Sequence, residues 1–393
     1  MKRSTFIIIG FIIIILLLAF WLYSLLYGTP QKAADVFVNF GFAGNSSGPD
    51  IIPVVATSTD EEPVVDVTTA KLRQLTVRPV IGFREFQATS TEPKFITYAE
   101  AGTGHIYTIN LTTGKEIRVS NVTIPTAETA VFSAGGRFAV IRSGFTNKNE
   151  VVLIDLNDLT NIQSEVLPYN MSDFTFSATD ELLFTEVTTV GTRGRALNPS
   201  TKEVRDIFII PFQSVAMIWS RDGITPHYAY PKASSRLPGY LYVIKDGSIV
   251  RVPVSGLGLT AEASVDYITF SRLVNLNQQS FFYDTETEII ENSPIMLTPE
   301  KCVFTYNNST KLFCGYEITE YPYAFPDDWY KGIRIFSDRI WEVDLNAQSA
   351  SQIISPPVAV GRELDITDMS IGLDDKMLYF TNKNDRTLWL YEI

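Results

Sequence analysis

A strand pattern that recurs about every 43 residues most constrains the fold of this chain. In residues 131–160 an apolar strand ends at Ser133, a Gly-Gly turn follows, and two further apolar strands precede the next turn. The closing residue of the first strand recurs at Ser177, Ser220 and Tyr306, and the last interval is twice the others. A repeat of about 40–45 residues with four strands is typical of one β-propeller blade.

The pattern predicts seven blades. Their first strands are expected near residues 85, 130, 174, 217, 263, 303 and 368. The copy near 263 is degenerate, and its place follows from the period. The chain ends after the third strand of the last blade, and residues 70–78 have the pattern of its missing outer strand. We therefore predict an all-β, seven-bladed β-propeller over residues 70–393, in which the N-terminal strand closes the ring and removes two sheet edges.

Several segments also carry a family resemblance: VFSAGGRFAVI (131–141), IWSRDGITPHYAY (218–230), LDDKMLYFTN (373–382) and LRQLT (72–76). They resemble the TolB/WD40-like (PD40) β-propeller repeat. Residues 301–317 and 321–344 are similar to uncharacterised membrane-anchored propellers of candidate-phylum (Patescibacteria) bacteria. The resemblance implies the propeller fold and an anchored protein, and it implies no catalytic residues.

Composition excludes several classes of function. The net charge is -12, with no Lys/Arg cluster, which argues against a nucleic-acid partner. The chain has only two histidines and two cysteines, too few for a Cys/His metal site, so we expect no metal and no cofactor.

An apolar segment near the N-terminus predicts a membrane anchor. Residues 6–27 carry no charge over 22 positions, which span about 33 Å as a helix, enough to cross a bilayer. Lys2 and Arg3 precede the segment, whereas six acids and one lysine follow it up to residue 70. The positive-inside rule then places residues 1–5 in the cytoplasm and the propeller outside the cell membrane, in a single-pass protein.

A cleaved signal peptide is the alternative reading of residues 6–27, but such peptides have shorter apolar regions and a small-x-small cleavage site. Residues 28–69 are rich in Pro, Gly, Ser, Thr and acids, and we predict a flexible extracytoplasmic linker. GNSSG at 44–48 matches a nucleophile-elbow pattern, but it lacks the strand–turn–helix context that this chemistry requires.

Cys302 and Cys314 flank a turn and are expected to face each other on adjacent strands. Outside the membrane such a pair can oxidise, so we predict a disulfide, with two reduced, buried cysteines as the alternative.

An aromatic insertion at residues 320–338 is the best candidate binding loop. Aromatic and Arg side chains suit contact with a partner. The alternative is that the rings cover the end of a blade core. The candidate binding residues are Tyr321, Tyr323, Phe325, Trp329, Tyr330 and Arg334.

No catalytic residue is predicted. His105 and His227 lack a paired nucleophile in a recognisable pattern, and Asp155 and Asp158 lack the further oxygen ligands of a calcium loop. We expect structural roles for all four.

The predicted function is that of a binding or assembly module of the cell envelope, with a protein or glycan partner; the sequence favours this over an enzyme but does not decide between the two. The alternatives are an envelope hydrolase or lyase with its site at the channel mouth, and a purely structural component. Converging carboxylates and histidine at one end of the channel would favour the enzyme. An apolar or aromatic rim would favour binding.

Overall fold

The computed structural model describes residues 70–87, 92–145, 148–220, 222–317 and 325–393. The predicted anchor at 6–27 and linker at 28–69 lie outside this part of the chain. Among the described residues no helix has the length and apolar character needed to cross a membrane. The described residues are mostly β, so the predicted all-β class is confirmed.

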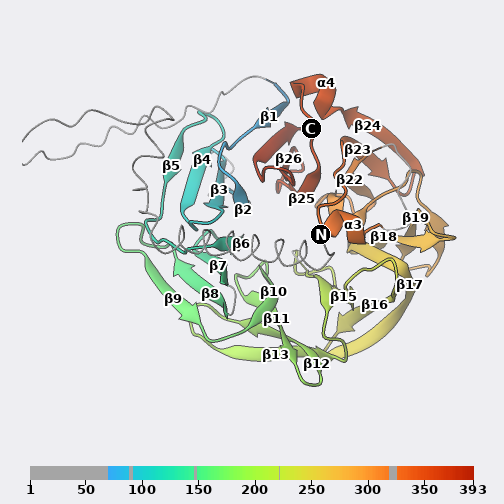
Figure 1. Cartoon of the computed structure of the whole chain (residues 1–393), viewed down its shortest axis with the longest axis horizontal. Helices are drawn as coiled ribbons and strands as arrows, with labels where there is room; N and C mark the ends of the chain where they lie inside the picture. The colour runs from blue at the N-terminus through green and yellow to red at the C-terminus, as the bar shows by residue number, and fades with distance from the viewer. Residues whose placement is uncertain (1–69, 88–91, 146–147, 221, 318–324) are drawn as a thin grey trace, which may run out of the picture. The chain divides into compact units, whose positions relative to one another are not determined.

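The described strands form antiparallel sheets arranged around a common centre, and β2, β6, β10 and β25 lie on the side of their sheets that faces this centre (Figure 1). Three four-stranded sheets come first in the chain. Their strands are β2 (Val80–Phe86), β3 (Phe95–Glu100), β4 (Ile106–Asn110) and β5 (Glu116–Arg118); β6 (Ala127–Phe132), β7 (Phe138–Phe145), β8 (Lys148–Asp155) and β9 (Gln163–Leu167); and β10 (Met171–Phe176), β11 (Leu182–Thr188), β12 (Gly191–Leu197) and β13 (Val204–Ile210).

A seven-stranded sheet follows. It contains β14 (Val215–Ile218), β15 (His227–Pro231), β16 (Pro238–Lys245), β17 (Ser248–Ala263), β18 (Tyr267–Val274), β19 (Asn277–Asp284) and β20 (Ile290–Asn292). The remaining elements are η1 (Pro299–Lys301), β21 (Cys302–Phe304), β22 (Lys311–Tyr316), α3 (Asp327–Tyr330), β23 (Arg339–Asp344), β24 (Ser349–Ile354), α4 (Pro356–Val360), β25 (Ile366–Ile371), β26 (Met377–Asn382), β27 (Leu388–Glu392) and β1 (Leu72–Gln74). Of these strands, β21–β24 form one sheet, and β25–β27 form another with β1.

The long strand β17 differs from the sequence prediction. A separate first strand was expected near residue 263, but β17 runs without a break through 16 residues, pairing with β16 early and with β18 late. The chain changes direction at Gly256 (φ 157°) and Gly258 (φ 62°), backbone angles that favour glycine. The register against β18 shifts just after Leu257. A glycine kink thus replaces the expected loop.

Hydrogen bonds to the serine side chain explain why the closing serine recurs. The Oγ of Ser133 accepts a hydrogen bond from the backbone N–H of Phe138, the first residue of β7, at 3.0 Å. The Oγ of Ser177 accepts one from Glu181 N–H at 3.1 Å, just before β11. Ser264, after β17, accepts one from Tyr267 N–H at 3.1 Å. The hydroxyl therefore holds the turn between the first and second strands closed.

An aspartate in the same turn of the next sheet links neighbouring sheets. Asp375, between β25 and β26, accepts hydrogen bonds from the backbone N–H groups of Tyr306 and Asn307, both at 2.8 Å. Asp180 accepts one from Gly135 N–H at 2.9 Å in the same way. Both aspartates have positive φ angles, 55° and 62°, which Asp tolerates better than most residues.

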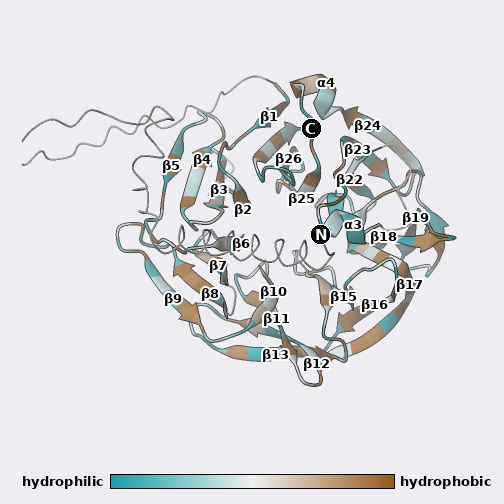
Figure 2. Ribbon diagram, viewed as in Figure 1, coloured by the Kyte–Doolittle hydropathy of each residue, from teal (hydrophilic) through white to brown (hydrophobic). Residues whose placement is uncertain are grey.

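The apolar core lies between adjacent sheets, and consecutive strand residues are buried, as in Leu182–Thr185 of β11 and Leu388–Tyr391 of β27; Figure 2 shows brown, apolar stretches along the strands. One core cluster joins Phe138 and Val140 of β7 to Phe174 and Phe176 of β10, for example. Each sheet therefore buries one face against the sheet before it and the other against the sheet after it.

The N-terminal strand β1 pairs antiparallel with β27, and Arg73 lies opposite Leu390. In Figure 1 the blue strand β1 lies beside the red C-terminal strands. Leu72 and Leu75 are buried, and Nη1 of Arg73 lies 2.6 Å from Oε1 of Glu392. These contacts join residues from opposite ends of the described chain.

The Asp375→Ala variant should lower the free energy of unfolding by about 1–3 kcal/mol, because two backbone N–H groups lose their charged acceptor. Urea denaturation measures the change. Asp246→Ala is the matched control, since Asp246 also has a positive φ (51°) but lies in a turn inside one sheet. Equal losses in the two variants would show that Asp375 stabilises only its own turn.

Candidate functional site

A cavity of about 190 Å³ lies where the strands β14, β17, β21 and β25 end. Residues that follow β14, residues at the end of β17, and residues of β21 and β25 line it. They include Trp219, Asp222, Glu262, Ser264, Phe304, Tyr306 and Ile371. The ends of these strands and the turns that follow them therefore build the cavity wall.

Three exposed apolar side chains line this cavity, and a fourth, Leu373, lies two residues beyond the lining residue Ile371. Ile224, Val265, Tyr306 and Leu373 lie in the turns that follow β14, β17, β21 and β25, and we call these four residues the apolar rim. Their exposed fractions lie between 39% and 74%. Exposed apolar side chains around a cavity are a candidate interaction site.

The polar groups of the cavity are largely engaged within the fold. Burial alone would raise the pKa of Asp222, but hydrogen bonds from Thr225 and from the backbone N–H of Ile224 hold that pKa below its usual value. Glu262 is the other carboxylate on the wall. An aspartate stabilised as an anion in this way is a weak proton acceptor.

The side chains of both histidines contact other residues of the fold. His227 accepts a hydrogen bond from the backbone N–H of Ser220 on Nδ1 at 3.0 Å, and its ring packs edge-on against Trp219. His105 lies 3.0 Å from the hydroxyl of Thr123. Burial lowers the pKa of both rings. Neither histidine lines the cavity, so the enzyme-like convergence of carboxylates and histidine is not found there.

The described part of the aromatic insertion packs into the fold. Phe325 and Trp329 are buried, and they form one apolar cluster with Tyr316 and Phe336. This arrangement favours the alternative in which the rings cover the end of a core. Tyr321 and Tyr323 lie outside the described residues.

The two remaining residues of the predicted binding loop also contact the protein itself. The hydroxyl of Tyr330 donates to Oε1 of Glu300 at 2.6 Å, and burial raises the pKa of this tyrosine. The guanidinium of Arg334 lies over the ring of Phe336 and 3.9 Å from Glu317. Both side chains therefore attach the insertion to the neighbouring residues Glu300 and Glu317.

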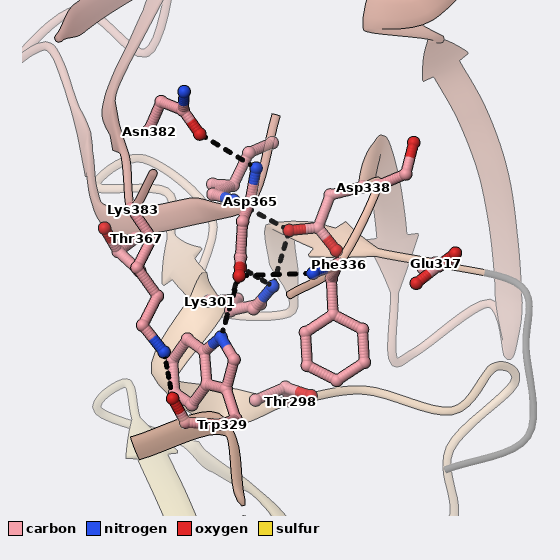
Figure 3. A network of polar contacts seen from close by, with 12 residues as sticks. Thr298, Lys301, Glu317, Trp329, Phe336, Asp338, Asp365, Thr367, Asn382 and Lys383 are labelled. Carbon is pink, nitrogen blue, oxygen red and sulfur yellow. Dashed lines mark hydrogen bonds and ion pairs between the residues drawn. The ribbon is translucent and has the colours of Figure 1, made fainter. Parts of the chain in front are cut away.

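A fully buried charge cluster lies beneath this insertion (Figure 3). The Nζ of Lys301 lies 2.6 Å from Oδ2 of Asp338 and 2.6 Å from Oδ1 of Asp365, and all three side chains are 0% exposed. Trp329 donates its indole N–H to Asp365, at 3.1 Å from each carboxylate oxygen. Burial raises the pKa of Asp338 to about 6, although Lys301 opposes this shift.

Sequence analysis did not identify this cluster. Lys301 and Asp365 each directly precede a first strand, β21 or β25, and Asp338 directly precedes β23. A lysine at the start of a strand is normally exposed, and nothing in its neighbours marks it as buried. The three residues converge only because the strands of two adjacent sheets begin at the same end.

Cys302 and Cys314 lie directly opposite each other on β21 and β22. They form a disulfide, with the two sulfur atoms 2.09 Å apart. Among the described residues, no group of three or more His, Cys, Asp or Glu side chains could hold a metal ion.

Comparisons with known proteins support the fold. The sequence matches no protein-family model and no curated protein. The structure is similar to an oligogalacturonate lyase in complex with manganese, with a TM-score of 0.53 and 11% identity over 82% of this chain and 98% of that one. The oligogalacturonate lyase of Vibrio parahaemolyticus gives a TM-score of 0.50 and 11% identity, over 79% and 96% of the two chains.

The acylaminoacyl peptidase of Pyrococcus horikoshii is also similar, with a TM-score of 0.50 and 12% identity. The similarity covers 77% of this chain and 50% of the peptidase. The structural neighbours are β-propeller proteins, so this chain has a β-propeller fold. At such low identity the similarity shows the fold alone.

The Trp329→Ala variant should lower the free energy of unfolding by about 3–5 kcal/mol, because a buried ring and its hydrogen bond to Asp365 are both lost. Urea denaturation followed by circular dichroism measures the loss. Ile333→Ala is the matched control in the same insertion, since Ile333 is 71% exposed. If the two variants were equally stable, Trp329 would not be part of the core.

Proposed function

We propose that this protein is a membrane-anchored β-propeller of the PD40 type that binds a partner in the cell envelope through the apolar rim. The observation that carries the proposal is the exposed apolar rim around the cavity. Three of its four side chains are aliphatic, which favours a protein over a glycan as the partner. The rigid sheets behind the turns hold these side chains in place, so binding would cost little conformational entropy.

A hydrolase or lyase at the same mouth is the weaker candidate. Its chemistry would rest on Asp222 and Glu262, the two carboxylates of the cavity wall. Asp222 already accepts hydrogen bonds that stabilise its anion, and neither His105 nor His227 is among the residues that line the cavity. The apolar rim is better suited to contact than to proton transfer.

The proposed architecture is a closed ring of seven blades. Dividing the seven-stranded sheet at Gly256–Gly258 gives two blades, and the four-stranded sheets supply the other five. Strand β1 would serve as the outer strand of the blade formed by β25–β27. Such a non-covalent closure would join the two ends of the propeller.

The proposed location is outside the cell membrane. Residues 6–27 would cross the bilayer, residues 1–5 would remain in the cytoplasm, and residues 28–69 would tether the propeller. The support is the uncharged length of 6–27 and the basic residues Lys2 and Arg3 before it.

The double variant Ile224→Ser/Tyr306→Ala should reduce recovery of the partner about tenfold or more in a chemical cross-linking pull-down from native membranes, because the rim loses its largest apolar contacts. Quantitative mass spectrometry of the cross-linked proteins is the readout. The melting temperature should not change, since both side chains are exposed.

The matched control for the rim is Val358→Ser. Val358 is 86% exposed on α4, which joins β24 to β25 and therefore lies at the opposite end of the first strands. This variant should retain the partner. Full recovery with the rim variant, or equal loss with both, would contradict binding through the rim.

The Leu72→Ala variant tests the proposed closure. It should lower the free energy of unfolding by about 2–5 kcal/mol, because Leu72 of β1 is buried in a core cluster with Trp389 and Tyr391 of β27. Val77→Ala, at a site 72% exposed, is the control. Closure through β1 would be refuted if Leu72→Ala unfolded at the same urea concentration as the natural protein.

A further inference from the structure

We propose that Lys301 and Asp338 join in an intramolecular amide bond, formed by the folded protein itself with Asp365 as the catalytic residue that moves the protons. The bond would link the side-chain nitrogen Nζ of Lys301 to the carboxyl carbon Cγ of Asp338. It would add a covalent cross-link to a sheet that already contains the disulfide Cys302–Cys314.

The geometry brings the reacting atoms together. The Nζ of Lys301 lies 2.6 Å from Oδ2 of Asp338. Because a carbonyl C–O bond is about 1.2 Å long, Cγ of Asp338 lies within about 3.8 Å of Nζ. Atoms held this close react as if at very high concentration, and the fold has already met the entropy cost of bringing them together.

The surroundings favour condensation over a permanent ion pair. All three side chains are fully buried, and Nζ of Lys301 lies 4.5 Å from the ring centre of Phe336 and 5.1 Å from that of Trp329. In this apolar setting an ammonium group and two carboxylates are costly. An amide replaces one ammonium and one carboxylate with a neutral group.

The two aspartates have different surroundings, which assigns their roles. Asp365 accepts hydrogen bonds from the indole N–H of Trp329 and the backbone N–H of Phe336, contacts that stabilise its anion. Asp338 accepts only one backbone hydrogen bond, from Ile366 N–H at 2.8 Å, and its Oδ1 has no partner among the described residues. Burial also raises the pKa of Asp338, so this carboxyl is the one that takes up a proton.

The reaction is balanced without an added reagent. Lys301 loses two protons from Nζ, which forms a bond to Cγ of Asp338. Asp365, in contact with Nζ, receives these protons and passes them to Oδ1 of Asp338. The bond between Cγ and Oδ1 then breaks, and Oδ1 leaves as water. Neither oxidant nor cofactor takes part.

The product fits the same contacts. Oδ2 of Asp338 becomes the amide oxygen and keeps the hydrogen bond from Ile366 N–H. The remaining hydrogen on Nζ points to Asp365, which stays an acceptor. The oxygen that lacks a partner is the one that leaves.

Intact mass spectrometry of the full chain tests the cross-link. The protein is extracted from membranes in detergent, its disulfide is reduced, and it is weighed under denaturing conditions. The mass should be lower than the sequence mass by one water. A protease digest should give a branched peptide that joins the segments carrying Lys301 and Asp338. The full sequence mass, with linear peptides only, would overturn the proposal.

Two variants test the roles of Asp365 and Asp338 in the reaction. Asp365→Asn should keep the full sequence mass, because the amide side chain cannot accept the protons. Asp338→Asn should lose ammonia and reach the same final mass as the cross-linked natural protein. A cross-link in Asp365→Asn would show that Asp365 is not needed for the reaction. A folded Asp338→Asn protein that keeps its full sequence mass, without loss of ammonia, would refute attack at Cγ.

The partly exposed pair Lys311–Glu342, at 3.0 Å on the same sheet, provides the comparison within the molecule. It should give no branched peptide, because water solvates both charges. A branched peptide at this pair would mean that proximity alone, and not the buried site, produces such links.

Discussion

The pairing of β1 with β27 is the contact on which the proposed ring depends. Each sheet buries its faces against its two neighbours, so a gap in the ring would expose two apolar faces at once. In the sheet of β25–β27, the amide of Glu392 donates to Lys71 O at 2.8 Å, and Arg73 forms an ion pair with Glu392. The three-residue strand β1 thus supplies the outer row of backbone hydrogen bonds in this sheet.

The turns that follow the first strands connect this architecture to the proposed function. Their serines hold each turn closed, and Asp375 and Asp180 fasten one sheet to the next. The serines bond within their own turns and the aspartates bond to a neighbouring sheet. Other positions of these turns can therefore carry side chains that face the solvent. Ile224 and Leu373 occupy such positions. The structural repeat therefore fixes the rim without specifying its chemistry.

The sequence predicts the strands well because turn residues recur at a constant spacing. The predicted first strands near residues 130, 174 and 217 correspond to β6, β10 and β14. The continuous strand β17 could not be predicted, because SGLG suits both a loop and a glycine kink. The cluster of Lys301 with its two aspartates was missed for another reason: it depends on burial and on contacts between sheets, which no local pattern records. The packing of Trp329 depends on the same contacts.

Native-state hydrogen exchange of the amides of β27 tests the closed ring most directly. If β1 closes the ring, the Glu392 amide and its neighbours in β27 should exchange only on global unfolding, with the same free energy as amides of β11 in the middle of another sheet. Exchange of the β27 amides at a much lower free energy than those of β11 would show that β1 separates from the ring, and would contradict the closure.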